Sequence, residues 1–100
     1  MYNILANAMN PYSVKPLPSD IQASLAVRFR KLRKAQGYSQ EEMAKRSGVS
    51  LGSLKRFENT GLISLESLLK LSHLLDRLED FKGVFAPDED MKRIEKLFKS

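Results

Sequence analysis

The sequence predicts an all-α fold arranged as one compact domain, and three observations support that prediction. Apolar residues recur every three or four positions in several segments, a spacing that places side chains on one face of a helix. Three of these segments begin alike, because an apolar residue precedes a serine and a second apolar residue follows that serine by four positions. The 100 residues are 42% hydrophobic, which is enough for a single core.

The first expected helix begins at Ser19, which forms a Ser-x-x-Gln capping box with Gln22, and it ends before Gly37. Residues 1–18 contain three prolines and show no sustained periodicity, so we expect them to form an N-terminal arm. The apolar stripe of the first helix consists of Ile21, Leu25, Phe29 and Leu32.

The next three helices are expected over residues 40–46, 51–58 and 65–77, and each follows a capping serine: Ser39, Ser50 and Ser64. Gly48 supplies the left-handed backbone conformation that a sharp reversal between the first two of them requires. The leucines of the 65–77 helix that we expect to face inward, or nearly so, are Leu65, Leu68, Leu71, Leu74, Leu75 and Leu78.

The C-terminal third of the chain contains a short element and a final helix. Residues 78–83 are expected to close the core, although periodicity leaves open whether residues 83–86 form a strand instead. Pro87 interrupts the chain, and Asp88 can cap a helix that extends to its end. We therefore divide the chain into the arm (1–18), a helix-turn-helix domain (19–86) and a C-terminal amphipathic helix (87–100). The apolar stripe of that last helix, which we expect to contact its own domain, a second subunit or a partner, is Met91, Ile94, Leu97 and Phe98.

Positive charge is concentrated in one part of the sequence. The formal net charge is +5, and residues 19–63 account for all of it, with nine Lys or Arg residues against four Asp or Glu residues. The rest of the chain sums to zero. A localised basic region is typical of a protein that binds a polyanion.

Enzymes and metal proteins are poor fits to the composition. There is no cysteine, no glycine-rich phosphate loop and no spaced carboxylate pair outside the expected caps. The single histidine, His73, lies in a leucine-rich helix and is expected to be structural. No apolar run approaches the roughly 20 residues of a membrane span, and the N-terminus lacks the basic start of a secretory signal. We expect no metal, no cofactor and a cytoplasmic location.

The two short helices at 40–46 and 51–58 form a helix-turn-helix. Both are shorter than the roughly 12–15 residues at which an isolated helix becomes stable, so tertiary packing must hold them. An exposed second helix with basic and amide side chains can enter the major groove of DNA. The residues expected to supply the packing beneath it are Met43, Ala44, Val49, Leu54 and Phe57.

Residues 25–78 resemble the Cro/phage-repressor type of helix-turn-helix, often called the Xre family. The resemblance is carried by a Ser-Gln-Glu-Glu-Met-Ala run, a Gly-Val-Ser turn, a Phe-Glu pair and a Ser-Leu-Glu-Ser-Leu stretch. It implies a lambda-repressor-like domain of five helices that acts as a dimer on a palindromic operator. A regulator of this kind would be associated with the bacterial nucleoid when bound to DNA.

The resemblance also implies roles for individual residues. Base-edge positions fall on Leu51, Gly52 and Arg56, and Arg56 is the best reader because arginine can bond guanine O6 and N7 together. Family members that place glutamine at positions 51 and 52 differ here, so we expect DNA shape to carry more of the specificity. The pair Arg33 and Glu58 matches one that joins two helices internally. Phosphate contacts are expected from Gln40, Ser50, Ser53, Lys55 and Asn59.

Four of these assignments have plainer alternatives. Gln40 could simply suit a first helical turn, and Ser50 is a cap before it is a phosphate ligand. Leu51 could lean inward toward Leu54, and Arg56 could be a solvated surface residue.

Two functions remain open at the level of sequence. The stretch LKRFENTGLISLESLLKL resembles DNA-binding antitoxins that are paired with HipA-like kinase toxins, which implies a toxin partner and repression of the shared operon. The alternative is a protein–protein interaction module that uses the helical domain and the C-terminal helix to bind a partner protein.

Overall fold

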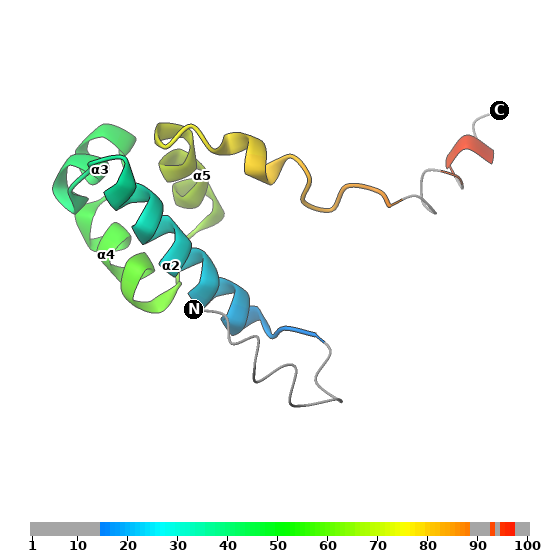
Figure 1. The fold of residues 1–100 in the computed structure, drawn as a ribbon, viewed down its shortest axis with the longest axis horizontal. Helices are drawn as coiled ribbons and strands as arrows, with labels where there is room; N and C mark the ends of the chain where they lie inside the picture. The colour runs from blue at the N-terminus through cyan, green and yellow to red at the C-terminus, as the bar shows by residue number, and fades with distance from the viewer. Residues whose placement is uncertain (1–14, 89–92, 94, 98–100) are drawn as a thin grey trace.

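A computed structural model of the chain describes residues 15–88, 93 and 95–97. Residues 15–88 form four α-helices and one 3-10 helix and contain no strand, as the sequence predicts. Figure 1 shows these elements as one helical body. Their bounds are α2 (Pro18–Ala35), α3 (Gln40–Ser47), α4 (Leu51–Thr60), α5 (Leu65–Leu74) and η1 (Leu78–Phe81).

The start of α2 differs from the prediction. The helix begins at Pro18, and Leu17 rather than Ser19 occupies the N-cap position. The backbone N–H of Leu17 donates to Asp20 Oδ2 at 2.9 Å. The carboxylate of the third helical residue thus satisfies the backbone N–H of the N-cap residue. Proline is favoured at the first helical position because its fixed φ suits a helix. The Pro18–Asp20 signal therefore takes precedence over Ser19 and Gln22.

The predicted apolar stripe of α2 is only partly correct. Phe29 is buried, Leu25 and Leu32 pack at the edge of the core, and Ile21 is nearly half exposed. The backbone of Gly61 lies against this end of α2. A Cβ on Gly61 would come within 2.9 Å of the backbone of Gln22, so there is no space for a side chain at position 61. The side chains of α2 that are buried are Ser24, Ala26, Phe29 and Arg33.

Helix α5 is shorter than predicted and buries fewer leucines. It ends at Leu74 rather than near Arg77, because Asp76 adopts a left-handed conformation with φ of 60°. Leu71 and Leu75 are buried, but Leu65 is 66% exposed and Leu78 is also exposed. Leu68 is the first leucine of α5 that packs against the core. Leu65 lies one turn earlier and does not reach the core. Residues 83–86 could have formed a strand, but 83–85 form turns and 86 has no regular structure.

The core lies where α4 packs against α2 and α3, and α3 in turn packs against α5. Two phenylalanine rings, Phe29 and Phe57, meet edge to face with centroids 5.4 Å apart. All five residues predicted to hold the short helices are buried. The complete core is Ala26, Phe29, Met43, Ala44, Val49, Leu54, Phe57, Leu71 and Leu75.

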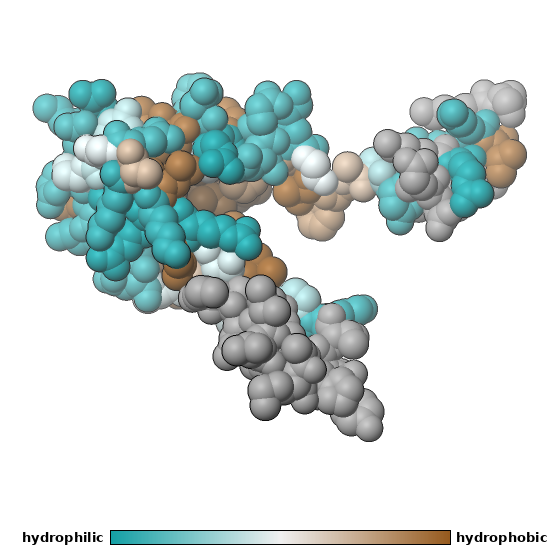
Figure 2. Space-filling model, in the orientation of Figure 1, coloured by the Kyte–Doolittle hydropathy of each residue, from teal (hydrophilic) through white to brown (hydrophobic). Residues whose placement is uncertain are grey.

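The surface is mostly hydrophilic over α2, α3 and α4, whereas hydrophobic residues appear along the segment after η1 (Figure 2). Val84 and Phe85 are exposed in that segment, and Phe85 completely so. Leu97 of the predicted C-terminal stripe is also exposed, in a short helical stretch. The other stripe residues, Met91, Ile94 and Phe98, lie outside the described residues. Within the described part of the chain, no helix combines the length and apolarity that a membrane span requires.

Candidate nucleic-acid interface

The turn between α3 and α4 is fixed by local hydrogen bonds, as the sequence predicts. Ser39 Oγ accepts the N–H of Glu42 at 3.1 Å at the start of α3. Gly48 ends that helix with φ of 79°, and its N–H donates to Ala44 O at 3.1 Å. Ser50 then caps α4. These contacts set the direction in which α4 leaves α3.

The inner side of α4 is anchored by apolar side chains. Leu54 and Phe57 are buried completely or almost completely, and both contact the core that includes Met43 of α3. Burying a side chain of this size contributes about 1.5–3 kcal/mol, so two such anchors can hold a helix of ten residues that would be marginal alone. The opposite side of α4 is therefore left to solvent.

That opposite side carries four of the eight residues predicted to contact DNA. Gly52, Lys55, Arg56 and Asn59 are all exposed, and their spacing places them together on one face. In the described part of the chain neither Lys55 nor Arg56 forms an ion pair, so both charges are available to a ligand. Apart from its chain neighbours and the backbone of its own helix, no heavy atom lies within 4 Å of the position where a Cβ of Gly52 would be. Leu51 differs from these residues because it is half-buried and packs against the core.

The two serines at the start of α4 are linked. Ser50 Oγ accepts the backbone N–H of Ser53 at 3.1 Å and donates its own proton to Ser53 Oγ at 2.8 Å. This contact uses one of the two hydroxyl protons, so the linked serines keep one hydroxyl proton for an outside acceptor such as a phosphate.

A cleft of about 350 Å³ lies beside α4, and sequence reasoning did not find it. It combines residues of α2, α4 and α5 with the 61–64 connection. Gln22 and Ser67 are distant in sequence from Arg56, so no spacing pattern could have grouped them. The polar side chains that line the cleft belong to Gln22, Ser53, Arg56, Ser64 and Ser67.

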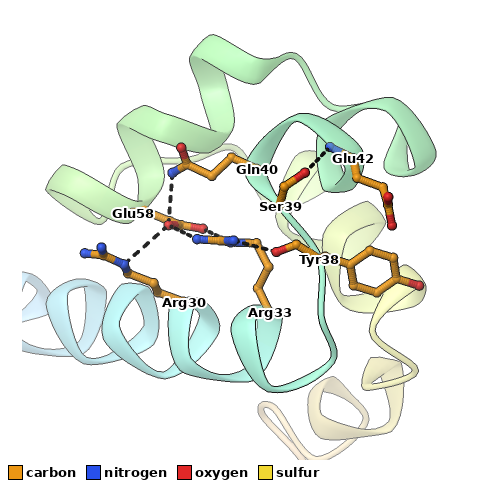
Figure 3. Close-up of polar contacts among 7 residues, drawn as sticks. All are labelled: Arg30, Arg33, Tyr38, Ser39, Gln40, Glu42 and Glu58. Carbon is orange, nitrogen blue, oxygen red and sulfur yellow. Dashed lines mark hydrogen bonds and ion pairs between the residues drawn. The ribbon is translucent and has the colours of Figure 1, made fainter.

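A buried ion pair joins α2 to α4, as the family resemblance implied (Figure 3). Arg33 donates from Nε to Glu58 Oε2 at 2.7 Å and from Nη2 to Glu58 Oε1 at 3.0 Å. The side chains of Arg33 and Glu58 are only 6% and 2% exposed. Arg33 also donates to the backbone oxygen of Tyr38 at 2.6 Å, which ties the loop before α3 to the same pair.

Gln40 belongs to this network, so its amide is held by a hydrogen bond and is not a free surface group. Its Nε2 donates to Glu58 Oε1 at 3.1 Å, and the residue is partly exposed at the first position of α3. An amide nitrogen carries two protons, so one remains for a second acceptor such as a phosphate. The network fixes the orientation of this predicted ligand.

Comparison with known proteins adds one result to this geometry. A protein-family model described as "Helix-turn-helix" matches residues 29–81, just over half of the chain. The matched range includes all of α3, α4, α5 and η1. No curated protein and no solved structure matches the chain.

Proposed function

The chain belongs to the Xre/Cro-type helix-turn-helix family of DNA-binding transcription regulators, and we propose that it is a dimeric repressor that occupies a palindromic operator. The observation that carries this proposal is the two-sided character of α4. Its inner side is buried through Leu54 and Phe57, while its outer side presents the exposed cations Lys55 and Arg56, which form no ion pair with another described residue. A rigid, basic, exposed helix suits the major groove.

In this proposal the outer face of α4 divides into base-reading and phosphate-binding positions. Arg56 donates two hydrogen bonds to a guanine edge, and Gly52 allows the helix to come close to the base pairs. Leu51 is half-buried, so its contribution is limited to contact with a thymine methyl at its exposed edge. The phosphate-binding positions are Gln40, Ser50, Ser53, Lys55 and Asn59.

We propose that two copies bind together, because one helix can read only a short half-site. Two copies related by a twofold axis would place their α4 helices about 34 Å apart, which is one turn of DNA. The proposed subunit contact is the C-terminal stripe of residues 91–98, to which the exposed Leu97 belongs. Repression would follow from occupation of a site that the transcription machinery needs.

The proposal extends to a toxin–antitoxin role, which rests on the resemblance of LKRFENTGLISLESLLKL to antitoxins of HipA-like kinases. In that role the protein would bind a kinase toxin and repress the operon that encodes both. The chain co-expressed with a kinase-like protein from the same operon should then copurify with it. A neighbouring gene that encodes no such kinase would contradict this part.

Gel shifts with two single substitutions test the DNA-binding proposal. Arg56→Ala should cost about 1–3 kcal/mol on the operator and reduce the preference for one base pair in each half-site. Lys55→Ala should weaken binding to all duplexes equally, because a phosphate contact carries no sequence information. Arg77→Ala, which removes an exposed arginine outside α4, is the matched control and should leave both properties unchanged.

A second candidate function is a protein–protein interaction module. The exposed apolar residues Val84, Phe85 and Leu97 favour it, since side chains of this kind often mark an interaction site. The double substitution Lys55→Ala with Arg56→Ala separates the two functions. It should abolish operator binding while leaving the dimer mass and any complex with a partner protein unchanged. Unchanged DNA affinity would favour the interaction module.

A further inference from the structure

The carboxylate of Glu58 accepts three hydrogen bonds from two neighbouring helices. Arg33 of α2 contributes two hydrogen bonds, and Gln40 of α3 contributes a third. The charges of Arg33 and Glu58 cancel, and both side chains are buried. Any further cation near this carboxylate is therefore not needed to neutralise it.

Arg30 is such a cation. It lies one turn before Arg33 on α2, and its Nε is 4.0 Å from Glu58 Oε1, which is too far for a hydrogen bond. Its side chain is 56% exposed, and it donates no hydrogen bond to any residue that the structure describes. A guanidinium has five N–H donors. Arg30 thus forms a long ion pair with Glu58, drawn as a dashed line in Figure 3, and its guanidinium still has donors that make no hydrogen bond within the described residues.

Gln40 approaches the same oxygen atom from another direction. Both Gln40 Nε2 and Arg30 Nε lie against Glu58 Oε1, at 3.1 and 4.0 Å. Figure 3 shows the amide of Gln40 and the side chain of Arg30 on either side of this Glu58 oxygen. A tetrahedral group with several acceptor oxygens can bond to both at once.

We infer that Arg30 and Gln40 together bind one phosphate of the DNA backbone. Glu58 follows Leu51 by seven residues and Lys55 by three, so these residues line one edge of α4. A DNA strand along that edge would meet Arg30 and Gln40 outside the groove that α4 enters. The inference rests on the proposed insertion of α4 into the major groove, and it adds a contact from α2, a helix outside the helix-turn-helix.

The first test measures the affinity of the full chain for its selected operator and for a random duplex between about 0.05 and 0.2 M salt. Arg30→Ala should lower the slope of log affinity against log salt by about one and weaken binding on the order of fivefold to tenfold near 0.1 M. The loss should be equal on both duplexes, because a phosphate carries no sequence information. Arg30→Lys, which keeps the charge, should retain most of the slope.

Arg28→Ala is the matched control, because Arg28 is an exposed arginine of α2 that lies two residues away and so faces another direction. It should keep the wild-type slope. The inference is overturned if Arg30→Ala binds with the wild-type slope, or if Arg28→Ala loses as much slope as Arg30→Ala does.

Failure of the inference can be told apart from failure of the proposed function. If the wild-type protein bound no duplex, the proposed function itself would fail. If it bound, and Arg56→Ala lost base preference while Arg30→Ala kept its salt slope, only the contact from α2 would be wrong. Circular dichroism of Arg30→Ala should match the wild type, and Arg30→Lys provides the same comparison with the charge in place.

Discussion

Replacing Glu58 with alanine should destabilise the domain strongly, because this residue neutralises a buried arginine. The substitution removes both hydrogen bonds from Arg33 to a carboxylate and also the bond from Gln40. Arg33, whose side chain is only 6% exposed in the native structure, would keep the Tyr38 carbonyl oxygen as its one strong acceptor. Its charge would then have no counter-ion in the interior.

The magnitude follows from that burial. Breaking a buried ion pair by removing one partner costs about 3–5 kcal/mol, since the remaining charge is left desolvated. A domain of this size is stable by about 5–15 kcal/mol, so the loss could take most of its stability. Glu66→Ala is the control. Glu66 pairs with Lys70 at 3.2 Å, but its side chain is 79% exposed, so its loss should cost less than about 0.5 kcal/mol.

Urea denaturation followed by far-ultraviolet circular dichroism measures both values. The midpoint should fall sharply for Glu58→Ala and hardly move for Glu66→Ala, with similar slopes of unfolding free energy against urea. Replacing both partners, as Arg33→Met with Glu58→Leu, should restore much of the stability because no charge is then buried. A loss for Glu58→Ala no larger than for Glu66→Ala would refute the reasoning.

Two further predictions concern the connections between helices. Gly61→Ala should destabilise the domain more than Gly48→Ala. Both positions have φ near 80°, a conformation that costs about 1–2 kcal/mol for a residue with a Cβ. Only at Gly61 would that Cβ also lie 2.9 Å from the backbone of Gln22. Equal losses in urea denaturation would contradict the close approach. Ser64→Ala should cost about 1 kcal/mol because it removes the cap of α5, whereas Ser19→Ala should be nearly neutral because α2 is capped at Leu17. Thermal unfolding of the two serine variants would check this, and a larger loss of stability for Ser19→Ala would show that Ser19 caps α2.

The parts of the fold that sequence predicted well are those fixed by neighbouring residues. Ser39, Ser50 and Ser64 cap their helices as expected, since a cap depends only on the next three residues. The packing beneath α4 was also predicted, because Leu54 and Phe57 lie on one side of a short helix whose other side is polar.

The prediction failed where two local signals competed or where tertiary contact decided. At the start of α2, Pro18 and Asp20 formed a helix signal as valid as that of Ser19, and sequence could not rank them. At the end of α5, the leucine pattern continued beyond the helix, but Asp76 adopts the left-handed conformation that usually falls to glycine or asparagine. The sequence alone could not single out either outcome.

The candidate site also divides into features that the sequence predicted and features that only the structure shows. The outer face of α4 follows from helical spacing, and the roles of its residues came from family resemblance. The position of Arg30 beside Gln40 depends on how α2 crosses α3 and α4, which no spacing along the chain reveals. Contacts between helices therefore require the structure.

The central claim is that the outer face of α4 reads a DNA duplex through Arg56, and selection of bound duplexes from a random library tests it most directly. The wild-type protein should select a palindrome with half-sites one helical turn apart, about 34 Å between their centres. Arg56→Ala should select the same spacing but lose its preference at one base pair in each half-site. Selection of an identical sequence by Arg56→Ala, or of no sequence by the wild type at low salt, would contradict the account.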